Sequence, residues 1–193
     1  RREKVKSPIK LPDTGKKVAI VGSGPAGLTC AYYSSLLGHD VTLIEASSEI
    51  GGMLRVIPKN RLPSEVVDRE IGDILERGIK VKTGMRVGDE VQLEDIIKEN
   101  DACLIAAGAW EAKNLDIPGG DLALSGLSFL NQASCGQTPP IGEKVVVIGS
   151  GGTAFDCATI VLRSGAKEVH IASLESRDDM LATPEEIERG LEE

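Results

Sequence analysis

Two segments of this chain, 127 positions apart, repeat one pattern of an apolar run, a glycine turn and a helical stretch. Residues 18–31 and 145–158 are identical at six of 14 positions, including a shared Gly-Ser-Gly. Each apolar run has the continuous hydrophobic character of a strand that is buried on both faces. A strand, a helix and a second strand within about 30 residues form a unit whose strands must be parallel. The predicted strands are 17–21 and 40–45 in the first copy, and 144–148 and 168–174 in the second.

Weaker patterns lie between the two copies. Residues 63–78 carry an apolar stripe at helical spacing, and 79–83 and 101–107 have the composition of short strands. Residues 111–143 contain several prolines and glycines and are interpreted as a connection. The predicted organisation is a basic arm at 1–16, a first domain at 17–115, a connection at 116–142 and a second domain at 143–193. We expect the second domain to be truncated, because the sequence stops within a helical pattern.

The glycine turns have the spacing of nucleotide-binding loops. Gly22–Gly27 reads G-x-G-x-x-G: the first glycine permits the turn, the second leaves room for a pyrophosphate, and the third lets helix and strand pack closely. Glu45 ends the second strand, where a carboxylate accepts hydrogen bonds from a ribose diol. Gly149–Ala154 is the G-x-G-x-x-A variant. Its nearest acid, Glu175, comes two residues later than Glu45 does in the first copy. The sequence therefore predicts an α/β chain with two Rossmann-like folds of three layers.

Composition excludes several classes of function. The chain has 193 residues, with 22 Lys or Arg and 30 Asp or Glu, a net charge of −8, and aromatic residues make up only 3%. An acidic chain poor in aromatic rings is unsuited to nucleic acid. The longest uncharged stretch, 18–38, is interrupted by glycines and a proline, so no membrane span is expected. Four scattered cysteines do not suit a disulfide-rich secreted scaffold, and no leader pattern opens the chain. We expect a cytoplasmic protein.

Neither the charged ends nor the cysteines and histidines offer a catalytic or metal site. Residues 1–17 carry a net charge of +5. This charge is typical of a solvated linker, and the alternative interpretation is a docking surface for an acidic partner. Cys30, Cys103, Cys135 and Cys157 form no close pair, and no metal-ligand spacing occurs. His39 and His170 have no partner legible in the sequence. We therefore expect no catalytic residue and no metal ligand among these side chains.

The order of motifs resembles the small chain of glutamate synthase and its relatives in the pyridine nucleotide-disulfide oxidoreductase superfamily. The segments that carry the resemblance are 18–27, Glu45-Ala-Ser-Ser-Glu-Ile-Gly-Gly-Met-Leu-Arg55, Ile57-Pro-Lys-Asn-Arg-Leu-Pro63, 101–109, 115–122 and the second glycine loop. That family binds FAD in a first fold and NAD(P)H in a second fold inserted into it. The resemblance implies that a hydride passes from NAD(P)H to FAD and electrons continue to an iron–sulfur partner, as part of a larger chain or complex.

The resemblance also assigns the cofactor-binding residues. Those expected to face FAD are Gly22, Ser23, Gly24, Pro25, Ala26, Gly27, Glu45, Ala46, Gly51, Gly52, Met53, Leu54, Arg55, Val87, Ala107 and Gly108. Those expected to face the nicotinamide nucleotide are Gly149, Gly151, Gly152, Thr153, Ala154, Glu175 and Arg177.

The sequence departs from the family in three ways. Ala106-Ala107-Gly108 stands where the family usually has Ala-Thr-Gly, so a hydroxyl is lost. Leu174-Glu175 stands where NADPH-using members have two arginines, which favours NADH weakly, while Arg177 leaves NADPH open. The segment that returns to complete the FAD site, and an N-terminal iron–sulfur domain, are expected outside this stretch. These departures leave an alternative open, a nucleotide-binding assembly or scaffold subunit that keeps the fold without reductase activity.

Overall fold

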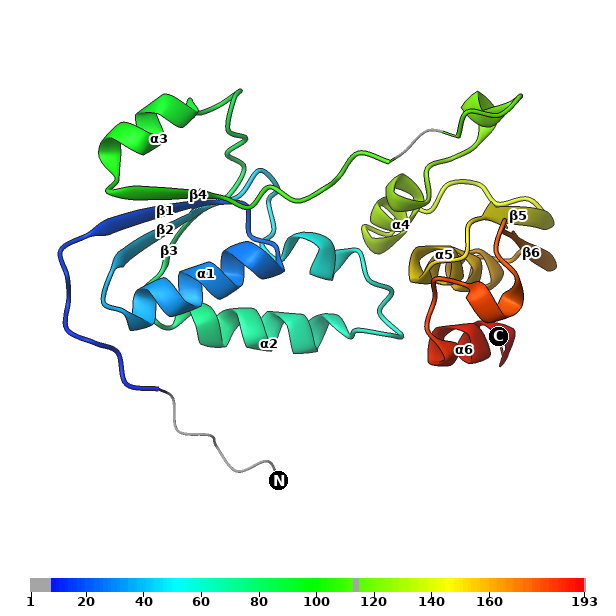
Figure 1. Ribbon diagram of the computed structural model, residues 1–193, viewed down its shortest axis with the longest axis horizontal. Coiled ribbons are helices and arrows are strands. Elements are labelled where there is room, and N and C mark those ends of the chain that lie inside the picture. The colour runs from blue at the N-terminus through cyan, green and yellow to red at the C-terminus, as the bar shows by residue number, and fades with distance from the viewer. Residues whose placement is uncertain (1–7, 113–114, 193) are drawn as a thin grey trace. The chain divides into compact units, whose positions relative to one another are not determined.

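The computed structural model describes residues 8–112 and 115–192, which form two compact units (Figure 1). Unit 1 extends to Leu54 and resumes over Ser64–Gly108. Unit 2 comprises Arg55–Pro63 and Ala109–Glu193. The chain therefore enters unit 2 briefly, returns to unit 1, and enters unit 2 again.

Unit 1 is built on a parallel sheet of order β3-β2-β1-β4. The strands pair in parallel, with Val18 opposite both Val41 and Ala102. Parallel neighbours need a crossover, and a helix precedes each of the later strands. The elements in chain order are β1 (Lys17–Val21), α1 (Pro25–Leu36), β2 (Asp40–Ile44), the 3₁₀ turn η1 (Gly52–Arg55), α2 (Ser64–Leu75), β3 (Lys80–Lys82), α3 (Leu93–Glu99) and β4 (Ala102–Ile105).

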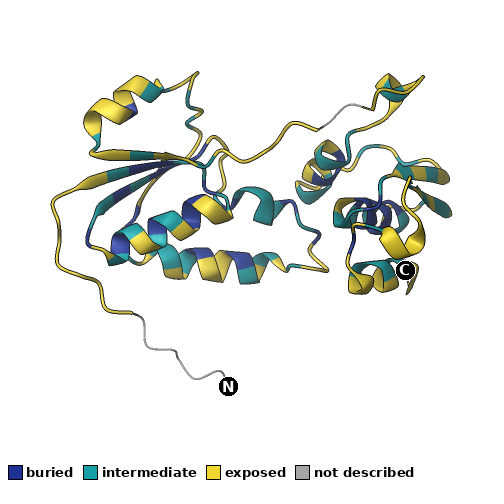
Figure 2. Cartoon of the chain, in the orientation of Figure 1, coloured by how far each residue is buried: buried dark blue, intermediate teal, exposed yellow. Residues whose placement is uncertain are grey.

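The helices of unit 1 lie on both faces of its sheet, as in a three-layer fold (Figure 1). Helix α1 packs on β1 and β2 with α2 beside it, and α3 lies against β1 and β4 on the opposite face. Ile20 and Leu43, on the two central strands, are fully buried, whereas Leu104 and Ile105 on the edge strand are exposed. Figure 2 shows this contrast between the central strands and β4. The core therefore lies on both faces of the central strands, against α1 on one face and against Ile96 of α3 on the other.

Unit 2 contains the second strand–helix–strand copy. Strands β5 (Lys144–Ile148) and β6 (Glu168–Ala172) pair in parallel, with Val145 opposite Val169. Helix α5 (Gly152–Arg163) packs on both strands and on the two other helices, α4 (Gly126–Ser134) and α6 (Pro184–Glu192). Two short 3₁₀ turns, η2 (Gly120–Leu122) and η3 (Arg177–Asp179), complete it. Parallel pairing and the α/β class agree with the prediction.

Two helices differ from the sequence-based expectation. Helix α4 lies within the predicted connection, because Ser125 caps it by accepting a hydrogen bond from the Ser128 N–H and because Phe129 and Leu130 are buried. Helix α3 has only seven residues and a single buried side chain, Ile96, too short a pattern to be recognised by period. The predicted strands 40–45, 79–83, 101–107 and 168–174 each end earlier in the structure than expected.

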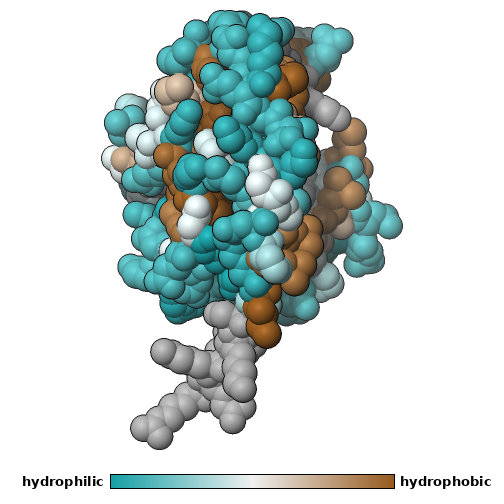
Figure 3. Space-filling model, turned by 90° about the vertical axis from the view of Figure 1, so that its left-hand side faces the viewer, coloured by the Kyte–Doolittle hydropathy of each residue, from teal (hydrophilic) through white to brown (hydrophobic). Residues whose placement is uncertain are grey.

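The first part of the predicted basic arm, residues 1–7, lies outside the described residues. Residues 8–16 are exposed and form no helix or strand. They are nevertheless attached to unit 1, since Leu11 N–H donates to the Leu36 carbonyl and Lys16 pairs with Asp101 at 2.8 Å. Figure 3 views the surface from one side, where hydrophilic groups predominate and hydrophobic atoms lie between them in narrow bands. Among the described helices, none is long and apolar enough to cross a membrane.

Candidate functional site

The first glycine loop is held against the turn that follows β4. Gly22 has a φ of 102°, a left-handed conformation that favours glycine. A Cβ at Gly22 would strike the Ala106 carbonyl oxygen and lie 3.1 Å from the Ala107 nitrogen. The absence of a side chain therefore allows two predicted segments, the glycine loop and the Ala107-Gly108 turn, to meet.

The other two glycines of this loop have different roles. A Cβ at Gly27 would run into the Gly22 carbonyl, so this position needs glycine for α1 to pack on β1. Gly24, the N-cap of α1, has an ordinary φ of −68°, and a Cβ there would meet no atom within 4 Å. Pro25 follows at the start of α1. The space at Gly24 is thus open where a pyrophosphate would approach the free N–H groups of the helix N-terminus.

Glu45 is anchored by this loop. Its Oε2 accepts hydrogen bonds from the Ser23 N–H (2.9 Å) and hydroxyl (2.5 Å), and its Oε1 accepts one from the Ser47 N–H (2.8 Å). The residue is only 8% exposed. Burial by itself would raise the pKa of the Glu45 carboxyl, but the hydrogen bonds from Ser23 and Ser47 lower it below its usual value. An ionised acceptor is therefore held at the end of β2.

The segment after β2 folds back onto the same loop. The Gly51 N–H donates to the Ser23 hydroxyl at 3.0 Å. Gly52 has a φ of 53°, and a Cβ there would lie 2.8 Å from the Gly24 Cα. Met53 and Leu54 follow in η1 and are half-buried. The structure thus brings Gly22–Gly27, Glu45, the Gly51-Gly52 pair and the Ala107-Gly108 turn to one end of the unit 1 sheet.

Three other residues were also predicted to face FAD. Val87 packs against a core cluster of Ala19, Ile44 and Ile96. Arg55 opens the segment 55–63, which belongs to unit 2. Ala46 is exposed, directly after Glu45. Their part in cofactor binding stays a prediction.

The second glycine loop repeats the geometry of the first. Gly149 has a φ of 136° and Ala154 is buried beneath the loop. Gly151, the N-cap of α5, has a φ of −88°, and a Cβ there would meet no atom within 4 Å. Thr153 is exposed in the first turn of α5. The open second glycine at the helix N-terminus therefore occurs in both copies.

Glu175 in the second copy accepts a hydrogen bond from a loop serine, as Glu45 does in the first copy. The Ser150 hydroxyl donates to Glu175 Oε2 at 2.8 Å, and Ser150 is the repeat equivalent of Ser23. This hydrogen bond lowers the pKa of the Glu175 carboxyl. The strand ends at Ala172, so the chain has turned before Glu175 and brings this later residue back to the loop. Arg177 is exposed in η3. Residue counting along the strand could not show that Glu175 reaches Ser150.

An arginine that the sequence analysis did not single out ties residues 55–63 to unit 2. One guanidinium nitrogen of Arg61 lies 2.9 Å from both Asp156 carboxylate oxygens and 3.1 Å from Glu186 Oε1. Glu186 also accepts from the Thr183 N–H, and the Thr183 hydroxyl accepts from the Glu186 N–H, a capping box at the start of α6. A Cβ at Gly152 would lie 2.7 Å from Glu186, so this carboxylate fits beside the start of α5.

We expect Arg61→Met to destabilise unit 2 by about 1–3 kcal/mol, since two carboxylates that are mostly buried lose their cation. Desolvation already raises the pKa of Asp156, and Arg61 opposes that rise. Without Arg61 the folded-state pKa rises further above the unfolded value. The destabilisation should therefore be largest at neutral pH and shrink as the pH falls through the raised pKa.

Urea unfolding followed by the fluorescence of Trp110, the single tryptophan and part of unit 2, measures this effect at pH about 7.5 and about 5. The control is Arg69→Met, which removes an exposed pair with Glu70 and should leave the midpoint nearly unchanged. Equal losses at both pH values would contradict a role for Asp156 ionisation.

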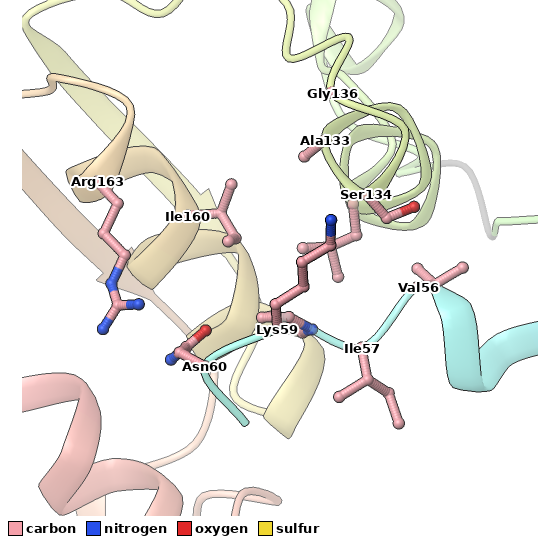
Figure 4. Close-up of a pocket in the computed structure, with 11 residues that line it drawn as sticks. Val56, Ile57, Lys59, Asn60, Ala133, Ser134, Gly136, Ile160 and Arg163 are labelled. Atoms are coloured by element: carbon pink, nitrogen blue, oxygen red, sulfur yellow. The ribbon is translucent and has the colours of Figure 1, made fainter. Parts of the chain in front are cut away.

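Unit 2 also contains a cavity of about 220 Å³ between residues 56–60, α4 and α5 (Figure 4). Its walls are mainly apolar, and Lys59 reaches from the loop toward α4. The lining residues are Val56, Ile57, Pro58, Lys59, Asn60, Leu130, Ala133, Ser134, Gly136, Ile160 and Arg163. None of them is a predicted cofactor-binding residue.

The sequence assigned no role to the cysteines and histidines, and their surroundings in the structure are structural ones. All four cysteines are free; Cys157 is buried and Cys135 is exposed. Burial raises the pKa of the Cys157 thiol to about 12, which makes it unreactive. His170 contacts Glu168 at 2.6 Å on the surface of β6, and His39 contacts Thr14. Among the described residues, no group of His, Cys, Asp and Glu is arranged to hold a metal ion.

Comparison with known proteins places this geometry in a family. The chain is 40% identical over 190 residues to the NADPH-Fe(3+) oxidoreductase subunit beta of Geobacter sulfurreducens, covering 94% of this chain and 28% of the relative. It is 38% identical to the glutamate synthase [NADPH] small chain of Mycobacterium tuberculosis, covering 84% of this chain and 36% of the relative. The chain thus spans about a third of the length of these curated relatives.

The fold is also that of a solved oxidoreductase. FprA of Mycobacterium tuberculosis, solved in complex with NADPH, superposes with a TM-score of 0.78 at 22% identity, over 92% of this chain and 48% of FprA. The family model described as pyridine nucleotide-disulphide oxidoreductase matches residues 16–193. Together with the two glycine loops, this match shows that the chain belongs to the pyridine nucleotide-disulphide oxidoreductase family.

Proposed function

We propose that this chain is the part of a flavin-dependent oxidoreductase that binds FAD in unit 1 and NAD(P)H in unit 2. The observation that carries the proposal is the duplicated site. Each unit has a glycine loop with open space at its second glycine, and a carboxylate bound to the serine beside that glycine. Open backbone at a helix N-terminus suits a pyrophosphate, and the carboxylate suits a ribose diol.

In unit 1 the residues present fit an adenine dinucleotide. Gly22–Gly27 would hold the pyrophosphate, and Glu45 the adenosine ribose. Gly51 donates to Ser23 of the same loop, and Gly52, which has no Cβ, packs closely on Gly24. The Ala107-Gly108 turn lies against the same loop, at Gly22. We assign FAD to this unit because the order of motifs is that of flavoproteins whose first fold binds FAD.

In unit 2 the residues present fit the adenosine half of a nicotinamide nucleotide. Gly149, Gly151, Thr153 and Ala154 would surround the pyrophosphate, and Glu175 the ribose. Gly152 is occupied on its Cβ side by the Glu186 carboxylate, which pairs with Arg61. Relatives are named for NADPH. A carboxylate anchored where a 2′-phosphate would lie nevertheless opposes that phosphate. We therefore keep the weak preference for NADH as a proposal for this chain.

The proposed reaction needs no acid, base or nucleophile from the chain. When bound, a nicotinamide and a flavin supply the hydride chemistry between them, and the protein provides position and electrostatics. We propose that the electrons continue to an iron–sulfur partner subunit or domain. Two relatives are named as a subunit and a small chain, which supports an assembly. The free cysteines suit a reducing compartment, so we propose a cytoplasmic location.

The test is spectroscopic. The full-length protein should carry a visible flavin absorbance band that bleaches anaerobically when NADH or NADPH is added. A protein with bound flavin that neither nucleotide bleaches would support the scaffold alternative. A protein that retains no flavin after reconstitution with FAD would contradict the assignment of unit 1.

A further inference from the structure

We propose that Ser150 is a positioning residue that sets the choice of nucleotide, by holding Glu175 toward the adenosine ribose. Ser23 has the same task for Glu45 in the first site. This inference rests on the proposed function and concerns specificity at the same sites. It is carried by hydrogen bonds that occur in both copies of the repeat.

The two serines stand at the same place in their loops. Ser23 and Ser150 each follow the first glycine, 127 positions apart, and both are buried, with 0% and 4% exposure. Each hydroxyl donates to a glutamate that lies 22 or 25 residues further along the chain. The difference in spacing shows that the loop–acid contact recurs although the acid sits at a different position after its strand.

The two carboxylates are anchored to different extents. Glu45 is buried and both its oxygens accept hydrogen bonds, from Ser23 and from Ser47. Glu175 is exposed, and within the described part of the chain its carboxylate is held by the hydrogen bond that the Ser150 hydroxyl donates from the glycine loop. A glutamate side chain has several rotatable bonds, and leaving it unanchored costs entropy on ligand binding. The orientation of Glu175 therefore depends on Ser150 more than that of Glu45 depends on Ser23.

The consequence differs for the two nucleotides. A fixed Glu175 carboxylate can accept from the 2′-hydroxyl of NADH and opposes the 2′-phosphate of NADPH. If the anchor is removed, the side chain can turn away into solvent. The 2′-hydroxyl of NADH then loses a fixed hydrogen-bond acceptor, whereas the 2′-phosphate of NADPH is no longer repelled by a fixed carboxylate. Removing the Ser150 hydroxyl should therefore change the ratio of the two affinities and not merely lower both.

The experiment compares wild type, Ser150→Ala, Ser150→Thr and Ser23→Ala in the full-length protein. Dissociation constants of NADH and NADPH are measured by calorimetry, independently of turnover. Ser150→Ala should weaken NADH about five- to tenfold and leave NADPH unchanged or tighter. Ser150→Thr keeps a hydroxyl and should restore the wild-type ratio. Ser23→Ala should leave the ratio unchanged and raise the rate at which flavin dissociates.

The outcomes separate the inference from the function on which it rests. Equal weakening of both nucleotides by Ser150→Ala, or failure of Ser150→Thr to restore the ratio, would overturn the positioning role while the proposed function stands. A wild type that binds neither nucleotide would overturn both. A shift in the nucleotide ratio caused by Ser23→Ala would show that the two serine–carboxylate pairs do not act separately, which also contradicts the inference.

Discussion

Gly24→Val should remove flavin from the full-length protein while leaving it folded. A valine side chain would occupy the space at the start of α1 where the proposal places the pyrophosphate, and we expect flavin affinity to fall at least about tenfold. Misfolding is not expected, because Gly24 has a negative φ and a Cβ there would meet no atom within 4 Å. The measurement is flavin content after gel filtration, with thermal unfolding as the check on folding.

The chain supplies a matched control for this variant. Gly151→Val places the same side chain at the equivalent position of unit 2, where the surroundings are also open. It should leave flavin content normal and abolish bleaching by NADH and NADPH. Gly27→Val differs from both, since its side chain would enter the Gly22 carbonyl, and it should lower thermal stability. Normal flavin content in Gly24→Val would place the FAD pyrophosphate elsewhere.

Glu175→Arg should move the nucleotide preference toward NADPH by about tenfold in kcat/KM. Replacing an anion by a cation next to the ribose reverses the sign of its interaction with a 2′-phosphate. Because Glu175 is exposed, solvent and salt screen much of this effect, so the shift should decrease as ionic strength rises. The measurement is kcat/KM for NADH and NADPH in wild type and variant at low and high salt.

Arg177 is the internal control for this prediction. It lies two residues beyond Glu175, exposed in η3, and carries the opposite charge. If it offsets Glu175 in the wild type, Arg177→Gln should increase the preference for NADH. A wild type that prefers NADPH tenfold, or an unchanged ratio in Glu175→Arg, would show that Glu175 does not face the ribose.

The strands and glycine loops could be predicted because their signals are local. Continuous apolar runs identify β1 and β5, and each glycine loop determines the turn and helix that follow. Helix α4 could not be recognised in this way, because its helical stretch lies in a segment whose prolines and glycines indicated a connection. Its stability depends on packing against α5, which is a tertiary contact.

Local motifs and the family resemblance could name candidate site residues, but not the contacts that position them. Glu45 was identified from its place at the end of β2. Its equivalent, Glu175, is positioned by the turn after β6. Counting residues along the strand does not predict the conformation of that turn, so the contact with Ser150 could not be predicted. Arg61 was missed for a related reason: its partners, Asp156 and Glu186, lie 95 and 125 residues further along the chain. A charge pattern within 55–63 gives no sign of them.

Because of residues 55–63, the two units cannot be separated by dividing the sequence at one point. Because these residues belong to unit 2 but lie before α2 of unit 1, no single cut yields both units intact. An expression fragment that starts after Gly108 would keep Asp156 and Glu186 without the arginine that neutralises them. On the ribosome, Arg61 emerges long before its partners, so this segment must wait for most of the chain to be synthesised. Exchanging unit 2 between relatives would therefore require transplanting this nine-residue stretch as well.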